Sequence, residues 1–303
     1  MHTIGYSADT AQKAGRTVHS VLKNTLGLSA SLISRLKRIP GSVTVDGRDV
    51  YVNYVIKEGE YLSVRPCCEA AAEKGTSLPG MPEILYEDGD FLILNKPAGL
   101  AVQPVQDESE VTLETYLRAY LGISGRPNPV SRLDRGTSGL MTVAKSGFVQ
   151  ELFKRNMHSA AYQKQYLALL AGTPEEPRGT VEAPIGFTEG STYARTVRAD
   201  GLISVTEYEV LESRGDISLV RLNPVTGRTH QLRVHMAYIG NPMLGDWLYG
   251  RRDERILRPA LHSYRLTVRH PLTGAVLECR CPLPEDMAGL CKNFACTQAP
   301  ADL

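Results

Sequence analysis

Asp134 has the clearest arrangement for chemistry in this sequence, because Arg132 and Arg135 flank it in a segment punctuated by Gly136 and Gly139. A cation within a few ångströms lowers the pKa of a carboxyl group by roughly 1–3 units. Asp134 is therefore expected to be ionised throughout the physiological range and able to act as a nucleophile or a base. The same composition is typical of a solvated surface ion-pair cluster, which contributes roughly 0–1 kcal/mol.

Several other stretches of the chain favour the first interpretation over the second. The segment around Asp134, residues 132–140 with the sequence RLDRGTSGL, resembles the catalytic motif of the RluA family of RNA pseudouridine synthases. Residues 95–100 (NKPAGL), 164–169 (KQYLAL) and 226–235 (TGRTHQLRVH) resemble the family's first motif, its Lys-x-Tyr strand and its third motif. Residues 261–262, 269–271 and 282–284 resemble its closing strands, so the resemblance covers residues 81–285.

The resemblance implies a role for four side chains in converting uridine to pseudouridine. Asp134 matches the family's catalytic carboxylate, which either attacks the sugar carbon or takes a proton from its neighbour, and both routes stay open. Arg228 matches the arginine that pairs with this carboxylate, and Tyr166 matches the active-site tyrosine. Leu232 matches an apolar position beside the base.

Elementary chemistry agrees with these roles, although each residue also has an ordinary structural interpretation. Thr229 is a plausible helix N-cap, so Arg228 would project from a helix start and bind a carboxylate bidentately. An arginine there is also typical of an exposed surface. Tyr166 would give a flipped-out base a stacking surface worth about 1–3 kcal/mol, but a tyrosine in an apolar strand is commonly a core residue.

Further basic residues of the matching motifs predict contacts with RNA phosphates, which would position the RNA without reading its sequence. They are Lys96, Arg132, Arg135 and Lys164. We expect no cofactor and no metal ion, because the reaction has no redox or phosphoryl step and the sequence has no nucleotide-binding motif. The six cysteines lack the Cys-x-x-Cys spacing of a zinc site and are expected to be free thiols.

Charge divides the chain into two parts. Residues 1–66 contain nine Lys or Arg against five Asp or Glu, whereas the whole chain has a net charge of only +1. Apolar residues at helical spacing over 17–26 and 31–37, followed by a hairpin at Asp46-Gly47 and a strand over 59–64, resemble the small RNA-binding module first described in a ribosomal small-subunit protein. A generic helical cap is the alternative. The predicted units are this module over 13–66, a linker over 67–80, the catalytic domain over 81–285 and a tail over 286–303.

The catalytic part is expected to have an α+β fold around a mixed, mainly antiparallel sheet, preceded by the small α/β RNA-binding domain. Strands are predicted over 91–94, 206–210 and 217–222. Helices are predicted over 113–121, ending at Gly122, and around Leu152, Phe153 and Met157.

The leading hypothesis is a pseudouridine synthase acting on ribosomal RNA. The same chemistry on transfer RNA, or a catalytically inactive RNA-binding or ribosome-assembly protein, are the alternatives. A small-molecule glycosidase fits poorly, because only one well-placed carboxylate is found. The sequence has no apolar run long enough to span a membrane and no signal-peptide pattern, so we expect a cytoplasmic monomer whose partner is RNA and not a membrane.

Overall fold

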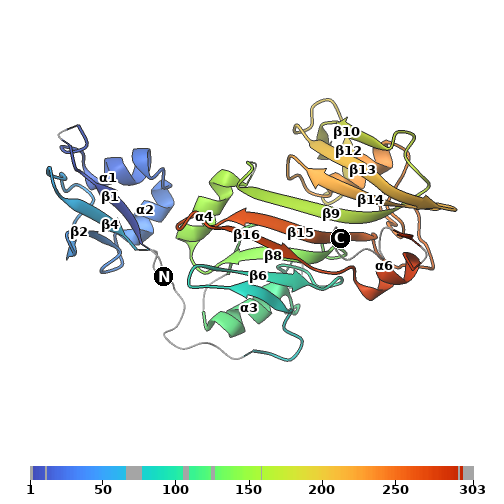
Figure 1. Ribbon diagram of the computed structural model, residues 1–303, viewed down its shortest axis with the longest axis horizontal. Helices are drawn as coiled ribbons and strands as arrows, with labels where there is room; N and C mark the ends of the chain where they lie inside the picture. The colour runs from blue at the N-terminus through green and yellow to red at the C-terminus, as the bar shows by residue number, and fades with distance from the viewer. Residues whose placement is uncertain are drawn as a thin grey trace.

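A long, twisted β-sheet forms the framework of the larger domain (Figure 1). The computed structural model describes residues 3–10, 12–65, 77–104, 109–123, 127–157, 159–292 and 294–295. The ten strands are β5 (Ile84–Glu87), β6 (Phe91–Lys96), β7 (Asn128–Pro129), β8 (Ser138–Ala144), β9 (Tyr162–Ala171), β10 (Arg178–Glu182), β13 (Val205–Arg214), β14 (Ile217–Pro224), β15 (Leu261–Arg269) and β16 (Val276–Arg280). A separate hairpin pairs β11 (Ile185–Phe187) with β12 (Arg195–Val197).

The order of the main sheet is β10-β13-β14-β9-β15-β8-β6-β5, with β16 beside β15 and β7 beside β8. Every strand pair in it is antiparallel except β8 with β15, which run parallel. The prediction of an α+β fold around a mixed, mainly antiparallel sheet is therefore confirmed. Within the described residues, no helix is both long and apolar enough to cross a membrane.

Two of the helices described in this domain end or begin at local sequence signals. The described helices are α3 (Leu113–Leu121), α4 (Gly147–Asn156), α5 (Gln231–Tyr238) and α6 (Glu285–Leu290). Helix α3 ends at Gly122, whose left-handed backbone (φ 62°) closes the last turn as the sequence predicts. Helix α4 begins after Ser146, whose hydroxyl accepts a hydrogen bond from the amide of Val149.

The N-terminal module has its own sheet, with the order β1-β4-β2-β3. Its strands are β1 (Ile4–Ser7), β2 (Val43–Val45), β3 (Arg48–Asp49) and β4 (Tyr61–Val64), and its helices are α1 (Val18–Ser20), which continues as a π-helical segment over Val21–Thr25, and α2 (Ala30–Leu36). The turn between β2 and β3 has the positive φ angles of Asp46 (47°) and Gly47 (79°) that the Asp-Gly pair predicts.

Two boundaries differ from the sequence-based division. Strand β1 pairs with β4, so the module contains residues before position 13. The segment from 286 onward, predicted as a tail, includes most of α6, and Met287, Cys291 and Phe294 are buried in a core cluster with Leu167 and Tyr264. Apolar burial explains this difference, because α6 covers the sheet. Residues 67–76 of the predicted linker lie outside the described residues.

The single parallel pair is a tight seam between β8 and β15. Ser138 and Gly139 are in register with His262 and Ser263, and the Ser138 hydroxyl hydrogen-bonds His262 Nδ1 at 2.9 Å. Burial lowers the pKa of His262 to about 4, so its imidazole is neutral in the seam. Gly139 has a φ of 110°, and a Cβ there would collide with the backbone of Ser263. Only glycine fits this position.

We therefore expect Gly139→Ala to lower the free energy of unfolding by at least about 2 kcal/mol, because it combines an unfavourable φ with a backbone collision. Urea denaturation followed by circular dichroism measures this loss. Gly215→Ala is the matched control, since Gly215 also has a positive φ (60°) but open space around its Cβ position. The control should cost only about 1 kcal/mol, and equal losses at the two positions would contradict the collision.

Candidate active site

The Asp134 carboxylate lies at the start of a tight turn that leads into β8. The amide of Thr137 donates to the carbonyl of Asp134 at 3.0 Å, and the amide of Gly99 donates to the carbonyl of Arg135 at 2.8 Å. The second bond ties the loop after β6 to the Asp134 loop. About a third (32%) of the Asp134 side chain is exposed, so the carboxylate is both anchored and accessible.

Lys96 holds these two loops together from inside, which corrects its prediction as a phosphate contact. Its side chain is fully buried, and Nζ donates to the carbonyls of Pro97 and Leu100 at 2.8 Å and of Arg135 at 3.3 Å. Burial lowers the pKa of Lys96 to about 7, although the negative charge of Asp134 acts in the opposite direction. An ammonium group enclosed by three carbonyls cannot reach an RNA backbone.

Arg233, on the first turn of α5, is the arginine that faces Asp134. Its Nη1 lies 3.5 Å from Asp134 Oδ2, and only 8% of its side chain is exposed. The other two nitrogens of the guanidinium form a bidentate ion pair with Asp246, with Nε 2.7 Å from Oδ2 and Nη2 2.8 Å from Oδ1. Asp246 is completely buried. The bidentate pair therefore fixes the guanidinium plane, and the remaining nitrogen points at Asp134.

The predicted pairing of Arg228 with Asp134 is wrong in this structure. The Nε of Arg228 donates to the carbonyl of Ile203 at 3.1 Å. The physical reason is the position of the helix start. His230 is the N-cap residue of α5, not Thr229, and it has a left-handed backbone with φ 58°. The chain thus turns after Arg228, and α5 presents Arg233 to the site.

His230 is a second neighbour of Asp134 that the sequence reasoning missed. Its Nε2 lies 3.8 Å from Asp134 Oδ2, and its Nδ1 is 2.6 Å from the Tyr249 hydroxyl, which also accepts from the Arg195 amide. Burial lowers the pKa of His230, although Asp134 opposes the shift, so the imidazole is neutral near pH 7. Tyr249 thus connects the His230 ring to the backbone of Arg195, and Nε2 is the ring nitrogen that faces Asp134.

A positive φ is uncommon for a residue other than glycine, and such strain concentrates at functional sites. In the described residues, only His230 and Asp46 have it. Asp46 is a turn residue, whereas His230 contacts the Asp134 carboxylate. The ring of Tyr249 also lies 4.9 Å from the Arg233 guanidinium, so one tyrosine supports both neighbours of Asp134.

Tyr166, on β9, belongs to an apolar cluster that also includes Leu133, the residue before Asp134. It is buried (5% exposed) in one cluster with Leu133 and Leu232, two residues that are also nearly buried. Burial raises the pKa of Tyr166 well above its usual range, and the charge of Asp134 adds to the rise. Its hydroxyl therefore keeps its proton at neutral pH. Tyr166 and Leu232 thus share one apolar cluster with Leu133, which precedes Asp134 in the chain.

The remaining predicted contacts lie around this centre. Arg132 is exposed, and Arg135 forms a bidentate pair with Glu110, with distances of 2.6 and 3.0 Å. Neither is among the described basic residues within 4.0 Å of the Asp134 carboxylate, which are Arg233 and His230. Lys164 is half-buried on β9, and burial lowers the pKa of its ammonium group.

Residues that could hold a metal ion lie at the other end of β6. Asp88, Asp90 and His270 bring ligand atoms within 4.8 Å of one another. The Asp88 carboxylate accepts from the amides of Asp90 and Phe91, and His270 Nδ1 accepts from two backbone amides after β15. These atoms already stabilise two turns, and the group lies at the opposite end of the strand from Lys96. They offer no chemistry to the Asp134 site.

The comparisons with known proteins agree with this geometry. Residues 90–238 match a family model described as RNA pseudouridylate synthase. The chain is 37% identical over 271 residues to an uncharacterised RNA pseudouridine synthase, YjbO of Bacillus subtilis, covering 88% of this chain and 96% of that protein. It is 34% identical over 299 residues to the ribosomal large subunit pseudouridine synthase C of Escherichia coli, covering 92% of this chain and 93% of that protein.

A solved structure extends the similarity to the fold. The human RNA pseudouridylate synthase domain containing 1 superposes with a TM-score of 0.55 at 33% identity, over 69% of this chain and 86% of that chain. These relatives and the matching motifs agree on one activity. The chain belongs to the RluA-like RNA pseudouridine synthases, enzymes that isomerise uridine in RNA to pseudouridine.

Proposed function

We propose that Asp134 is the catalytic carboxylate of this synthase and that Arg233, rather than Arg228, is its positioning partner. One observation carries the proposal: a partly exposed carboxylate lies 3.5 Å from a guanidinium whose other nitrogens are fixed on buried Asp246. Because Asp246 holds this guanidinium in place, it stays beside Asp134 while the base leaves the sugar. It holds one oxygen of Asp134 and leaves the carboxylate free to act at the sugar–base junction.

The proposed reaction balances without a cofactor. The bond from C1′ of the ribose to N1 of uracil breaks, the base turns, and a bond from C1′ to C5 forms. The hydrogen on C5 leaves to solvent, and N1 takes up a proton. Asp134 either attacks the sugar carbon or removes a proton from its neighbour, and both routes need the carboxylate to be ionised.

Tyr166 and Leu232 are proposed to hold the base while it turns. Their apolar surfaces, with Leu133, form one cluster beside Asp134. A flipped-out uracil needs such a surface, since it loses its stacking in the RNA. The protonated Tyr166 hydroxyl can donate a hydrogen bond to the base. Arg132, exposed next to this cluster, and Lys164 are proposed to contact phosphates.

The N-terminal module is proposed to bind RNA. All nine Lys and Arg side chains of residues 1–66 are exposed, and they include Arg35, Lys37 and Arg38. The first belongs to α2, and the next two directly follow that helix. A cluster of this kind supplies affinity for a phosphate backbone without selecting a sequence. The target uridine would then be chosen by the shape of the RNA near the catalytic site.

The substrate is proposed to be ribosomal RNA. The support is the Escherichia coli relative, whose name places its activity on the large ribosomal subunit and which matches this chain over 93% of its length. Transfer RNA is the alternative substrate. The test uses transcripts labelled with tritium at C5 of uridine, because pseudouridine formation releases that hydrogen to water.

We expect tritium release from large-subunit ribosomal RNA and none above background from a pool of transfer RNA transcripts. Release from transfer RNA alone would contradict the proposed substrate while keeping the chemistry. If both RNAs bind but neither releases tritium, the protein is an inactive RNA-binding scaffold, and the catalytic proposal fails.

A further inference from the structure

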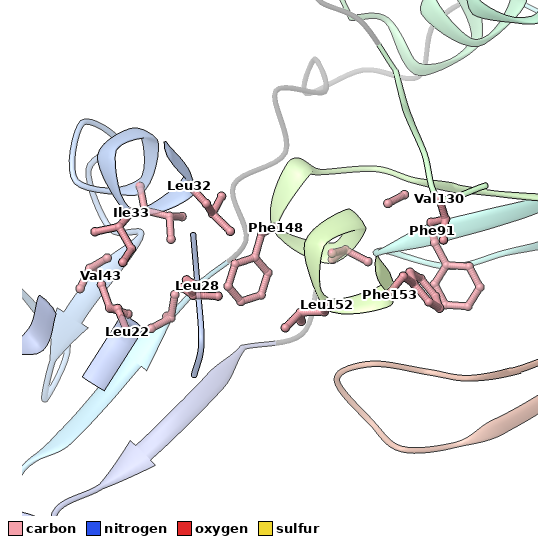
Figure 2. Packing of buried hydrophobic residues seen from close by; sticks show 14 of the residues in the cluster. Leu22, Leu28, Leu32, Ile33, Val43, Phe91, Val130, Phe148, Leu152 and Phe153 are labelled. Carbon is pink, nitrogen blue, oxygen red and sulfur yellow. The ribbon is translucent and has the colours of Figure 1, made fainter. Parts of the chain in front are cut away.

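Helix α4 has two apolar faces, and only one of them packs on the catalytic sheet. Phe153 lies on the sheet side, with its ring 5.0 Å from Phe91 and 5.9 Å from Tyr162 in edge-on contacts. Phe148 and Leu152 point away from these residues, towards the N-terminal module (Figure 2). A helix that is apolar on two sides needs two partners.

The N-terminal module is the second partner. Leu28 and Leu32 lie opposite Phe148 and Leu152 in Figure 2, and the four belong to one continuous cluster of buried residues. Phe148 is 1% exposed and Leu28 is 2% exposed. Side chains this deeply buried are typical of a domain interior and not of a chance surface contact.

Hydrogen bonds between the two domains surround this apolar contact. Glu151 of α4 accepts hydrogen bonds from the amide of Ser29 at 2.5 Å and from its hydroxyl at 2.7 Å. Ser29 is the N-cap of α2, so a carboxylate of the catalytic domain completes the start of a helix in the module. Arg155, which pairs with Glu151 at 3.2 Å, donates to the carbonyl of Leu26.

Two glycines in this contact each lie next to an arginine of the other domain. Gly27 has a φ of 62°, and a Cβ there would lie 2.7 Å from the Arg155 guanidinium. Gly147, at the start of α4, would place a Cβ 2.6 Å from the guanidinium of Arg35.

We propose that α4 is a docking surface for the N-terminal module, and that docking sets the direction in which the module's basic residues meet the RNA. A linker such as the one predicted over residues 67–80 would by default let the two domains move relative to each other. The contacts between α4 and the N-terminal module instead fix one arrangement of the two domains. Two RNA-binding surfaces in a fixed arrangement bind one RNA more tightly than two loosely tethered ones, because the second contact costs less entropy. This consequence for RNA rests on the proposed function, but the docking itself does not.

The test introduces repulsion without removing the helix cap. In Ser29→Asp of the full chain, aspartate still caps α2 but faces the Glu151 carboxylate. The double variant S29D/E151Q removes the repulsion and should restore docking. Asn53→Asp, at an exposed position of the same module, is the control for added charge. Hydrogen exchange of the α4 amides reports docking, and KM and kcat for tritium release report RNA use.

We expect Ser29→Asp to speed exchange in α4 and to raise KM roughly tenfold with kcat almost unchanged, while the double variant and Asn53→Asp behave as wild type. Unchanged exchange in Ser29→Asp would overturn the docking. Faster exchange with unchanged KM would overturn its role in RNA binding. If wild type releases no tritium, the proposed function fails, and the exchange data still decide the docking.

Discussion

Asp134→Asn is expected to lower kcat for tritium release by at least roughly 10²–10⁴-fold, because asparagine keeps the shape of the side chain but can neither attack carbon nor accept a proton. Binding of RNA should stay within about twofold of wild type, since phosphate contacts supply most of the affinity. Single-turnover release and a filter-binding assay on the same transcript measure the two quantities.

The control for Asp134→Asn is the same substitution at Asp216. That carboxylate is 66% exposed and pairs with Arg255 on the surface, away from the contacts of Asp134. Asp216→Asn should leave kcat and KM unchanged. Turnover at a normal rate in Asp134→Asn would eliminate this residue as nucleophile and as base.

Arg233→Lys is expected to lower kcat roughly 10²-fold, which is the second large effect. A lysine keeps the charge but cannot bind Asp246 with two nitrogens and reach Asp134 with a third. The carboxylate would lose its fixed orientation, and small misplacements of reacting groups are costly. KM should change little, because Arg233 is buried and its guanidinium is directed at Asp246 and Asp134.

Arg228→Lys is the matched control for Arg233→Lys, because it makes the same conservative change at the other arginine of the motif. Its guanidinium donates a hydrogen bond to the carbonyl of Ile203 and does not pair with Asp134, so we expect kcat within about threefold of wild type. Steady-state kinetics of both variants on one transcript decide between the two arginines. A large loss in Arg228→Lys together with an active Arg233→Lys would restore the assignment made from the sequence.

The sequence predicts elements well where a local signal ends or starts them. Gly122 ends α3 as expected, and the alternating apolar residues of β14 form a buried strand at the centre of the sheet. The RLDRGTSGL segment likewise points to Asp134 before any coordinates are considered. Tyr166 and Leu232 belong to the same apolar cluster, and their roles beside the base stay predictions.

What the sequence could not predict depends on contacts between distant segments. The motif at 226–235 contains two arginines that could pair with Asp134. Which of them does so depends on the left-handed His230 and on Asp246, a residue outside the individual motifs. Asp246 carries no local signal except its place in a Gly-Asp pair. The sequence does not predict a buried Lys96, because lysine is rarely buried and its carbonyl partners come from two loops that meet only in the fold.

The parallel seam has a consequence for how the enzyme loses activity. Asp134 lies in the loop before β8, on one side of the seam, whereas Tyr166 and Arg233 come from segments on the other side. Across the seam, only two residue pairs of β8 and β15 are in register. Each half of the sheet has antiparallel ladders of its own. A small separation of β8 from β15 would move the Asp134 carboxylate away from Tyr166 and Arg233, while most strands of the two halves remain paired. Heat or mild denaturant should therefore inactivate the enzyme before its secondary structure melts.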